Sequence, residues 1–291
     1  GEPVVRTAMR QAMRIMGHQF VMGRTIAEAL DNSLEGGNRR FRYTFDMLGE
    51  AALTAADAGR YLESYGRAIE ALRSRVGEYA DPEARPSISV KLSALHPRFE
   101  RANRKRVLAE LAPRLVDLCA AARDAGIALT LDAEESERLE ITLEVLGAIC
   151  RSGRLEGWSG LGLAVQAYQK RAQDVLRHLI GVARETNRLL HVRLVKGAYW
   201  DAEIKRAQER GLPGFPVFTR KPATDVSYLA CARLILEQGA GHLYPQFATH
   251  NAQTVAAVWH MARRFGREFE FQRLHGMGES LYAEVTRPDG L

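Results

Sequence analysis

Several common signatures are missing from this sequence of 291 residues. No apolar run approaches the ~18 residues that cross a bilayer as a helix, and no secretory signal pattern opens the chain. Only three cysteines occur, Cys119, Cys150 and Cys231, each in an apolar helical context and without C-x-x-C spacing. They are therefore predicted to be buried, reduced thiols of a cytoplasmic protein.

Motifs for several kinds of chemistry are absent as well. No G-x-G-x-x-G follows the first predicted strand, which argues against a Rossmann sheet, and no G-x-S-x-G elbow presents a nucleophile. His, Asp and Glu show no spacing typical of a metal site. The net charge of +6 comes from 41 basic and 35 acidic residues that are dispersed along the chain. This bias is too weak to predict nucleic-acid binding, but it fits an anionic cofactor or membrane surface.

Short β-rich runs alternate with helical stretches over most of the chain. The helices include residues 104–124 and 224–238, the second ending at Gly239, a plausible C-cap. Several strands are apolar along their length, as expected when both faces of a sheet are covered. Strands recur every ~38 residues on average, which is typical of repeated βα units. The predicted strands cover residues 41–48, 88–95, 127–133, 161–168, 189–196, 243–250 and 269–275.

Seven such units predict an α/β fold, a distorted (β/α)8 TIM-type barrel that lacks its last strand and final helix. We expect residues 1–40 to form an N-terminal helical segment and residues 41–291 to form the barrel domain. An open barrel edge is a liability, and the chain starts at Gly1 without Met. We therefore expect the polypeptide to continue beyond Leu291.

The N-terminal segment has two distinct parts. Residues 4–16 have helical periodicity, with Arg6, Arg10 and Arg14 on one face. This face could be solvated while the helix packs on the main domain, or it could lie on a membrane. Residues 31–40 are polar and glycine-rich, which predicts a connector.

Chemistry-bearing residues recur at the predicted strand ends, where barrels build their active sites. The strand over 189–196 carries Arg193 and leads to Lys196, Tyr199 and Trp200. Because burying unpaired cations is expensive, this segment predicts one wall of a site for an anionic ligand with a flat ring system. An inward Lys91 would need an anionic partner. Further polar groups at strand ends are Asp132, Gln166, Thr249, Asn251 and Gln272.

Other residues at these ends keep two interpretations. Glu134 and Glu135 could belong to the site or could start a helix, where carboxylates favour the dipole. His96 precedes Pro97 and could serve loop structure. His250 could be functional or a hydrogen-bonded core histidine. Residues 219–225 predict either a phosphate site at a helix N-terminus or an ordinary capped helix start.

Seven motifs in order carry a more specific signal: KLSALHPRFE, LDAEESERLE, VQAYQKRA, RLVKGAYWDAEIKRAQERG, TRKPATDVSYLACARLIL, FATHNAQT and FEFQRLHGMGE. Over residues 41 to about 285 the chain resembles the FAD-dependent proline dehydrogenases, in the form found as a domain of bifunctional bacterial proline utilization A. The resemblance implies a barrel that holds FAD non-covalently and oxidises L-proline to Δ1-pyrroline-5-carboxylate. It also implies hydride transfer to flavin N5, a quinone electron acceptor, and a cytoplasmic protein that is peripheral at the inner membrane.

The same resemblance assigns roles to individual residues. Lys91 would pair with the substrate carboxylate, Asp132 would orient neighbouring basic groups, and Arg193 would lie near flavin N5 as a catalytic residue with Tyr199. Leu194, Ala198 and Tyr199 would help to form the proline pocket. The remaining FAD contacts would be Ala133, Gln166, Val195, Lys196, Gly197, Ala198, Trp200, Thr219, Lys221, Thr224, Thr249, His250, Asn251, Gln272 and Leu274.

One part of the family pattern is missing from the sequence. In the family, a helix after the last strand carries paired arginines that clamp the proline carboxylate, and a pyrroline-5-carboxylate dehydrogenase domain follows in the full-length protein.

Two other functions remain open from the residues alone. A Schiff-base aldolase could use Lys91 as nucleophile if its pKa were depressed. A basic module for nucleic acid or membrane would need charge clustered on one face.

Overall fold

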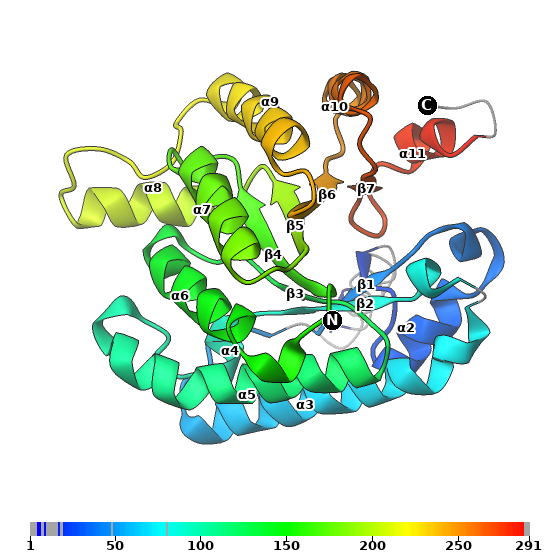
Figure 1. Ribbon diagram of the computed structural model, residues 1–291, viewed down its shortest axis with the longest axis horizontal. Helices are drawn as coiled ribbons and strands as arrows, with labels where there is room; N and C mark the ends of the chain where they lie inside the picture. The colour runs from blue at the N-terminus through cyan, green and yellow to red at the C-terminus, as the bar shows by residue number, and fades with distance from the viewer. Residues whose placement is uncertain are drawn as a thin grey trace.

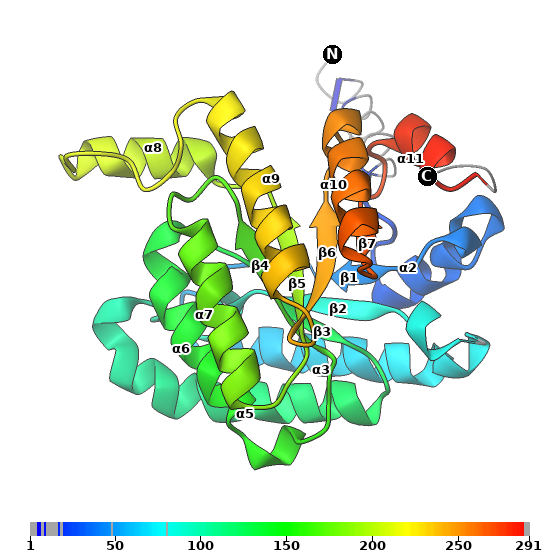
Figure 2. The same cartoon turned by 45° about the horizontal axis from the view of Figure 1, so that its top comes forward.

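The computed structural model describes residues 5, 6, 9, 17, 20–47, 49–79 and 81–287. Seven parallel strands pair in chain order and form one sheet that curls into a half-barrel (Figures 1 and 2). This arrangement confirms the distorted TIM-type fold. The strands are β1 (Thr44–Asp46), β2 (Ser87–Val90), β3 (Leu129–Leu131), β4 (Leu161–Gln166), β5 (Leu190–Val195), β6 (Leu243–Ala248) and β7 (Glu270–Gln272).

Helices cover the outer side of the sheet, where α3 packs on α5, α5 on α6, α6 on α7, α7 on α9 and α9 on α10, whereas α8 lies off to one side (Figure 1). The α-helices are α2 (Ile26–Ser33), α3 (Ala55–Arg75), α4 (Leu92–Leu95), α5 (Arg104–Asp124), α6 (Leu139–Cys150), α7 (Ala172–Glu185), α8 (Trp200–Glu209), α9 (Lys221–Gln238), α10 (Ala252–Phe265) and α11 (Glu279–Val285). The 3-10 helices are η1 (Gly36–Arg40), η2 (Val76–Glu78), η3 (Pro82–Ala84), η4 (Arg101–Asn103), η5 (Ser136–Arg138) and η6 (Gly153–Leu155). In the described residues, no helix is both long and apolar enough to cross a membrane.

The two faces of the sheet differ in polarity. Along β5, Leu190, Val192 and Leu194 are buried within the hydrophobic core, whereas the alternate residues are half-buried. Among these, Arg193 reaches across the barrel to Asp132 at the end of β3. Side chains alternate between the faces of a strand, so the outer face supplies the core and the inner face is left for polar groups.

Side-chain caps fix where several helices begin. Thr54 and Asp57 form a capping box at the start of α3, with the Thr54 amide 2.8 Å from Asp57 Oδ2. The side chain of Asn251 caps α10 by accepting a hydrogen bond from the Thr254 amide at 2.9 Å. Because α10 follows β6 directly, this cap fixes the backbone next to the carboxyl end of the barrel.

All seven predicted strands are confirmed, but with shorter bounds. Residues 92–95, predicted as strand, form the helical turn α4 instead. The buried carboxylate of Glu134 accepts a hydrogen bond from the Ser93 amide at 3.0 Å. This bond satisfies an amide in the first turn of α4 and so stabilises the helical turn in place of further sheet pairing. Helix α9 begins at Lys221, before the predicted start, because Pro222 occupies its first turn and is preorganised for a helix. The helix over 104–124 is confirmed, and Gly239 follows α9 as its C-cap.

The prediction of a connector over residues 31–40 is only partly right. Helix α2 continues to Ser33, and residues 36–40 form η1. A side-chain cap at Thr25, which accepts from the Glu28 amide at 3.2 Å, starts this short helix. Most of the predicted helix over 4–16 lies outside the described residues, as does residue 48.

A buried arginine joins the loops at the amino-terminal end of the barrel. Arg188 is 9% exposed and donates hydrogen bonds to the carbonyl oxygens of Cys150, Ser152, Leu155 and Trp158 at 2.6 to 3.3 Å. These carbonyls end α6 and line the turn before β4. One guanidinium thus satisfies four backbone carbonyls, two of which belong to the buried residues Cys150 and Leu155.

We expect Arg188→Met to lower the free energy of unfolding by about 3 kcal/mol, because buried carbonyls lose a charged donor. Urea denaturation of this variant beside Arg184→Met, at an exposed position of α7, measures the difference. Equal midpoints for the two variants would contradict this role of Arg188.

Candidate active site

Four charged side chains meet at the carboxyl end of the barrel interior: Asp46 from β1, Lys91 after β2, Asp132 after β3 and Arg193 from β5. We call them the charged quartet. Lys91 Nζ lies 2.8 Å from Asp46 Oδ2 and 3.1 Å from Asp132 Oδ2. Arg193 Nη1 lies 2.9 Å from Asp132 Oδ1. Asp132 therefore bridges two cations, and the formal charges of the quartet cancel.

Strand register explains why these residues meet. Asp46 is aligned with Ser89 and Ser89 with Thr130, so all three face the same side of the sheet. Lys91 and Asp132 follow two residues later and face the same side. The side chains of Asp132 and Arg193 are 14% exposed and that of Lys91 is 16% exposed, whereas Asp46 is 40% exposed. Asp46 therefore lies at the open side of the quartet.

Lys91 keeps its proton in this setting. Burial by itself would lower the pKa of Lys91, but the carboxylates of Asp132 and Asp46 outweigh it and raise the pKa above its usual value. The predicted need of Lys91 for an anionic partner is confirmed by two partners. Behind it, the hydroxyl of Tyr65 accepts a hydrogen bond from the Lys91 amide at 3.3 Å, and burial raises the pKa of Tyr65 to about 12.

The segment after β5 turns sharply beside the quartet. Gly197 has φ 144°, and a Cβ there would lie 2.4 Å from the Tyr168 ring. The Ala198 amide donates to Gln166 Oε1 at 3.1 Å. Tyr199 then donates from its hydroxyl to Glu50 Oε2 at 3.1 Å. Burial, followed by the negative charge of Glu50, raises the pKa of Tyr199, so its hydroxyl stays protonated.

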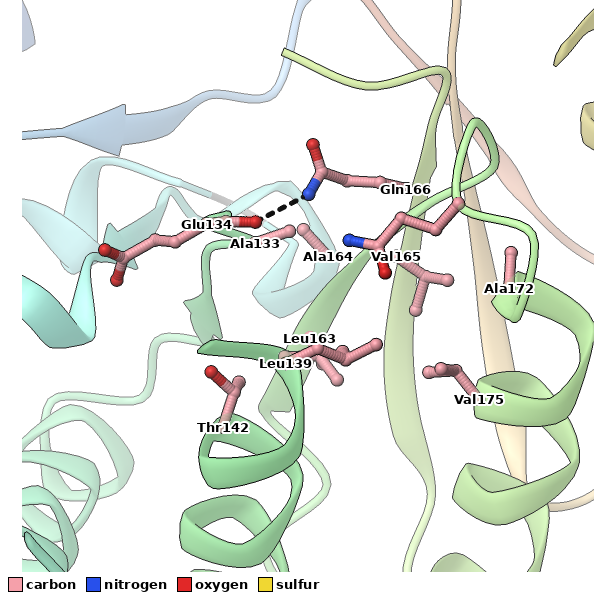
Figure 3. A pocket seen from close by; sticks show the side chains of 11 residues that line it. Ala133, Glu134, Leu139, Thr142, Leu163, Ala164, Val165, Gln166, Ala172 and Val175 are labelled. Atoms are coloured by element: carbon pink, nitrogen blue, oxygen red, sulfur yellow. Dashed lines mark hydrogen bonds between the residues drawn. The ribbon is translucent and has the colours of Figure 1, made fainter. Parts of the chain in front are cut away.

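The side chain of Gln166 joins this turn to the end of β3. Its amide nitrogen donates to the carbonyl oxygen of Glu134 at 2.8 Å, the dashed line in Figure 3. Ala133, Glu134 and Gln166 also line a small cavity that extends behind β4 to α6 and α7. Its free volume holds about one water molecule, so it is no substrate site. The other lining residues are Leu139, Thr142, Leu163, Ala164, Val165, Gln169, Ala172 and Val175.

A second group of cations lies at the start of α9. Lys196 Nζ lies 2.5 Å from Asp225 Oδ1, and Lys221 Nζ lies 2.7 Å from Asp225 Oδ2. Of the neighbouring hydroxyls, Thr219 is exposed and Thr224 is 8% exposed. A groove passes between the first turns of α9 and α10. Its lining residues are Lys221, Pro222, Asp225, Val226, Leu229, Asn251, Gln253 and Thr254.

The ends of β6 and β7 are tied together by hydrogen bonds. The Thr249 amide donates to the Gln272 carbonyl at 3.1 Å, and the buried hydroxyl of Tyr282 donates to the Thr249 carbonyl at 2.9 Å. His250 Nε2 accepts from the Leu274 amide at 3.0 Å. Burial, and secondarily the nearby Arg273, lowers the pKa of His250, which keeps the imidazole neutral.

The structure brings most of the predicted site residues to one end of the barrel, but it separates the side chain of Leu194. Leu194 is fully buried on the helix side of β5, where the Tyr228 hydroxyl donates to its carbonyl at 3.3 Å. The inner face of β5 carries Arg193 and Val195, and the role of Leu194 in the proline pocket stays a prediction. His96 also lies apart, with Nε2 3.3 Å from Glu110 on α5.

Sequence reasoning missed two carboxylates, Asp46 and Glu50, and it gave no role to Asp225 within the candidate segment 219–225. Asp46 is the last residue of β1, just as Asp132 is the first residue after β3. A carboxylate at a strand end was therefore a signal that could have identified Asp46 from the sequence. Asp225 lies one turn after Lys221 on the same helix, and this spacing predicts a pair. Glu50 meets Tyr199 over a sequence separation that offered no local signal.

The donor set suits an anionic cofactor with a flat ring. Arg193, Lys196 and Lys221 supply positive charge along the carboxyl end. Trp200 is 42% exposed and Leu274 is 65% exposed, which leaves apolar surface for a ring system. Among the described residues, no group of three or more His, Cys, Asp or Glu could hold a metal ion.

Comparisons with known proteins identify the family. A family model described as proline dehydrogenase matches residues 29–290. The chain is 54% identical over 288 residues to the bifunctional protein PutA of Salmonella typhimurium. The alignment covers 98% of this chain and 22% of that protein. The chain thus spans about a fifth of the length of the curated relatives it matches.

Comparison with solved structures points to the same family. A mutant of Bradyrhizobium japonicum proline utilization A superposes with a TM-score of 0.85 at 56% identity, over 97% of this chain and 29% of that one. Proline utilization A of Bdellovibrio bacteriovorus, solved after inactivation by N-propargylglycine, gives a TM-score of 0.91 at 28% identity, over 96% of this chain and 30% of that one. The fold, the matched residues and this identity together show that the chain belongs to the proline dehydrogenase family.

Proposed function

We propose that this domain binds FAD non-covalently and oxidises L-proline to Δ1-pyrroline-5-carboxylate. The observation that carries the proposal is the charged quartet, which lies beside Tyr199 in a chain of this family. FAD, when bound, would supply the oxidising chemistry by taking a hydride at N5 from the carbon next to the proline nitrogen and passing electrons to a quinone. The chain's own residues have to bind, orient and shield the reactants.

The quartet is suited to bind an amino acid. Lys91 is protonated and divides its hydrogen bonds between Asp46 and Asp132, so it can also contact a substrate carboxylate. Asp132 keeps its bond to Arg193 when that happens. Tyr199 and Ala198 would form the neighbouring wall of the pocket. A charge-neutral site is appropriate for a zwitterion, since neither end of the substrate meets an unopposed like charge.

The carboxyl end of the barrel would hold the cofactor. Arg193 would lie near N5, where a positive charge favours the reduced ring. Lys221 and the first turns of α9 and α10 would face the diphosphate or adenosine. The remaining proposed contacts are Ala133, Gln166, Val195, Lys196, Gly197, Ala198, Trp200, Thr219, Thr224, Thr249, His250, Asn251, Gln272 and Leu274.

The matched relatives extend the proposal beyond this domain. Because they are bifunctional and much longer than this chain, we propose that a pyrroline-5-carboxylate dehydrogenase domain accompanies it in the full-length protein. Transfer of electrons to a membrane quinone would make the cytoplasmic protein peripheral at the inner membrane.

An anaerobic absorption spectrum tests the proposal. We expect the full-length protein that contains this domain to show a flavin spectrum that bleaches when L-proline is added. Lys91→Met should retain FAD but need at least about tenfold more proline, because a charged hydrogen bond to the carboxylate is lost. Lys105→Met, at an exposed position of α5, should bleach as the unmodified chain does.

Two outcomes would contradict different parts of the proposal. No flavin spectrum after addition of FAD would remove the cofactor assignment. Flavin that is bound but does not bleach would contradict the proline assignment for this chain.

The aldolase alternative conflicts with the charge on Lys91. A Schiff base needs a neutral amine, yet two carboxylates raise the pKa of Lys91 above its usual value. We expect borohydride treatment with pyruvate at neutral pH to label Lys91 no more than the exposed Lys105. Selective reduction of an adduct onto Lys91, located by peptide mass, would revive the aldolase.

A further inference from the structure

A half-buried carboxylate lies inside the barrel, near the charged quartet. Glu270, from β7, has a side chain that is 17% exposed and forms an ion pair with Arg42, which precedes β1. Its Oε1 atom accepts hydrogen bonds from Gln246 Nε2 at 2.9 Å and from Gln272 Nε2 at 2.6 Å. None of the roles proposed above uses Glu270, although β7 ends only two residues later.

The carboxylate determines which way the Gln272 amide points. A carboxylate can only accept, so Gln272 must direct its NH2 group toward Glu270. The Gln272 oxygen is then left for Arg193, whose Nε donates to it at 2.8 Å. The Arg193 guanidinium is held in addition by Ser89 Oγ at 2.8 Å and by Asp132. A continuous line of hydrogen bonds thus joins Glu270 to the quartet.

We propose that Glu270 is a positioning residue, which orients Gln272 so that Arg193 is held at the flavin and the reduced cofactor is favoured. This inference rests on the proposed function. Glu270 itself is separated from the quartet by Gln272. Its effect is transmitted because a reversed Gln272 amide would place NH2 against the Arg193 Nε–H, two donors that cannot bond.

The variant Glu270→Gln should cause that reversal. Arg42 is a donor and would bind the oxygen of the new amide, so its NH2 group would face Gln272. Gln246 and Gln272 both donate to this position in the native chain, so both would turn their oxygens toward residue 270, and Gln272 would turn its NH2 group toward Arg193. The guanidinium would lose one of its three acceptors and move from its position beside the flavin.

Equilibrium redox titration of the FAD-loaded chain measures the consequence. We expect the equilibrium ratio of reduced to oxidised FAD to be about tenfold lower in Glu270→Gln than in the unmodified chain. For this two-electron couple, that ratio corresponds to a midpoint potential lower by about 30 mV. The control Glu268→Gln removes the same charge at an exposed position two residues earlier and should leave the potential unchanged.

The sign of the shift separates positioning from simple electrostatics. Removing a negative charge near the flavin would, through space alone, make reduction easier and raise the potential. A raised potential, or one equal to that of the Glu268→Gln control, would overturn the proposal. A merely structural role would change stability without lowering the potential of the folded fraction.

A second variant guards against misfolding, because Glu270→Gln leaves Arg42 without its charged partner. In Arg42→Met with Glu270→Met both charges are removed together, which folded proteins often tolerate, and the net charge is unchanged. Gln272 loses the acceptor that fixes its amide but meets no opposing donor at residue 270, so we expect a fall in potential that is smaller than in Glu270→Gln. An unchanged potential in this double variant would also overturn the proposal. If the unmodified chain bound no FAD, the proposed function would fail instead, so the two failures can be told apart.

Discussion

The arrangement of the site depends on one carboxylate, Asp132, between two cations. Charges inside a barrel are costly unless they are paired and hydrogen-bonded, and Asp132 uses one oxygen for Lys91 and the other for Arg193. With Asp46 on the open side, the charges cancel. The pairing keeps Lys91 protonated and fixes the guanidinium of Arg193 at the carboxyl end of β5. Both proposed recognition tasks, for the substrate carboxylate and for the flavin, start from this arrangement.

The barrel divides stability and chemistry between its two faces. The outer faces of the strands, with residues such as Leu129 and Leu194, pack into the core under the helices. The inner face is free to carry polar groups, and they connect from Arg42 through Glu270 and Gln272 to Arg193. Substitutions on the two faces should therefore have different consequences, one mainly for folding and the other mainly for the site.

Periodicity was sufficient to predict the strands and, with strand ends as a guide, Lys91, Asp132 and Arg193. It could not predict α4, since that turn depends on the buried carboxylate of Glu134 from a distant loop. The resemblance gave Leu194 a role in the pocket without saying which face of β5 it lies on, and the structure places its side chain in the core on the helix side. Contacts between segments far apart in the sequence, such as Tyr199 with Glu50, leave no periodic pattern, so they could be found only from the structure.

The most direct test of the central bridge is Asp132→Asn, compared with Asp124→Asn at an exposed position of α5. FAD retention and the rate of flavin reduction by L-proline would be measured for both. The bridge predicts that Asp132→Asn keeps FAD but reduces it at least about tenfold more slowly, as loss of a buried charged hydrogen bond implies. A reduction rate equal to that of the control would contradict the account, and so would loss of FAD in proportion to the loss of rate.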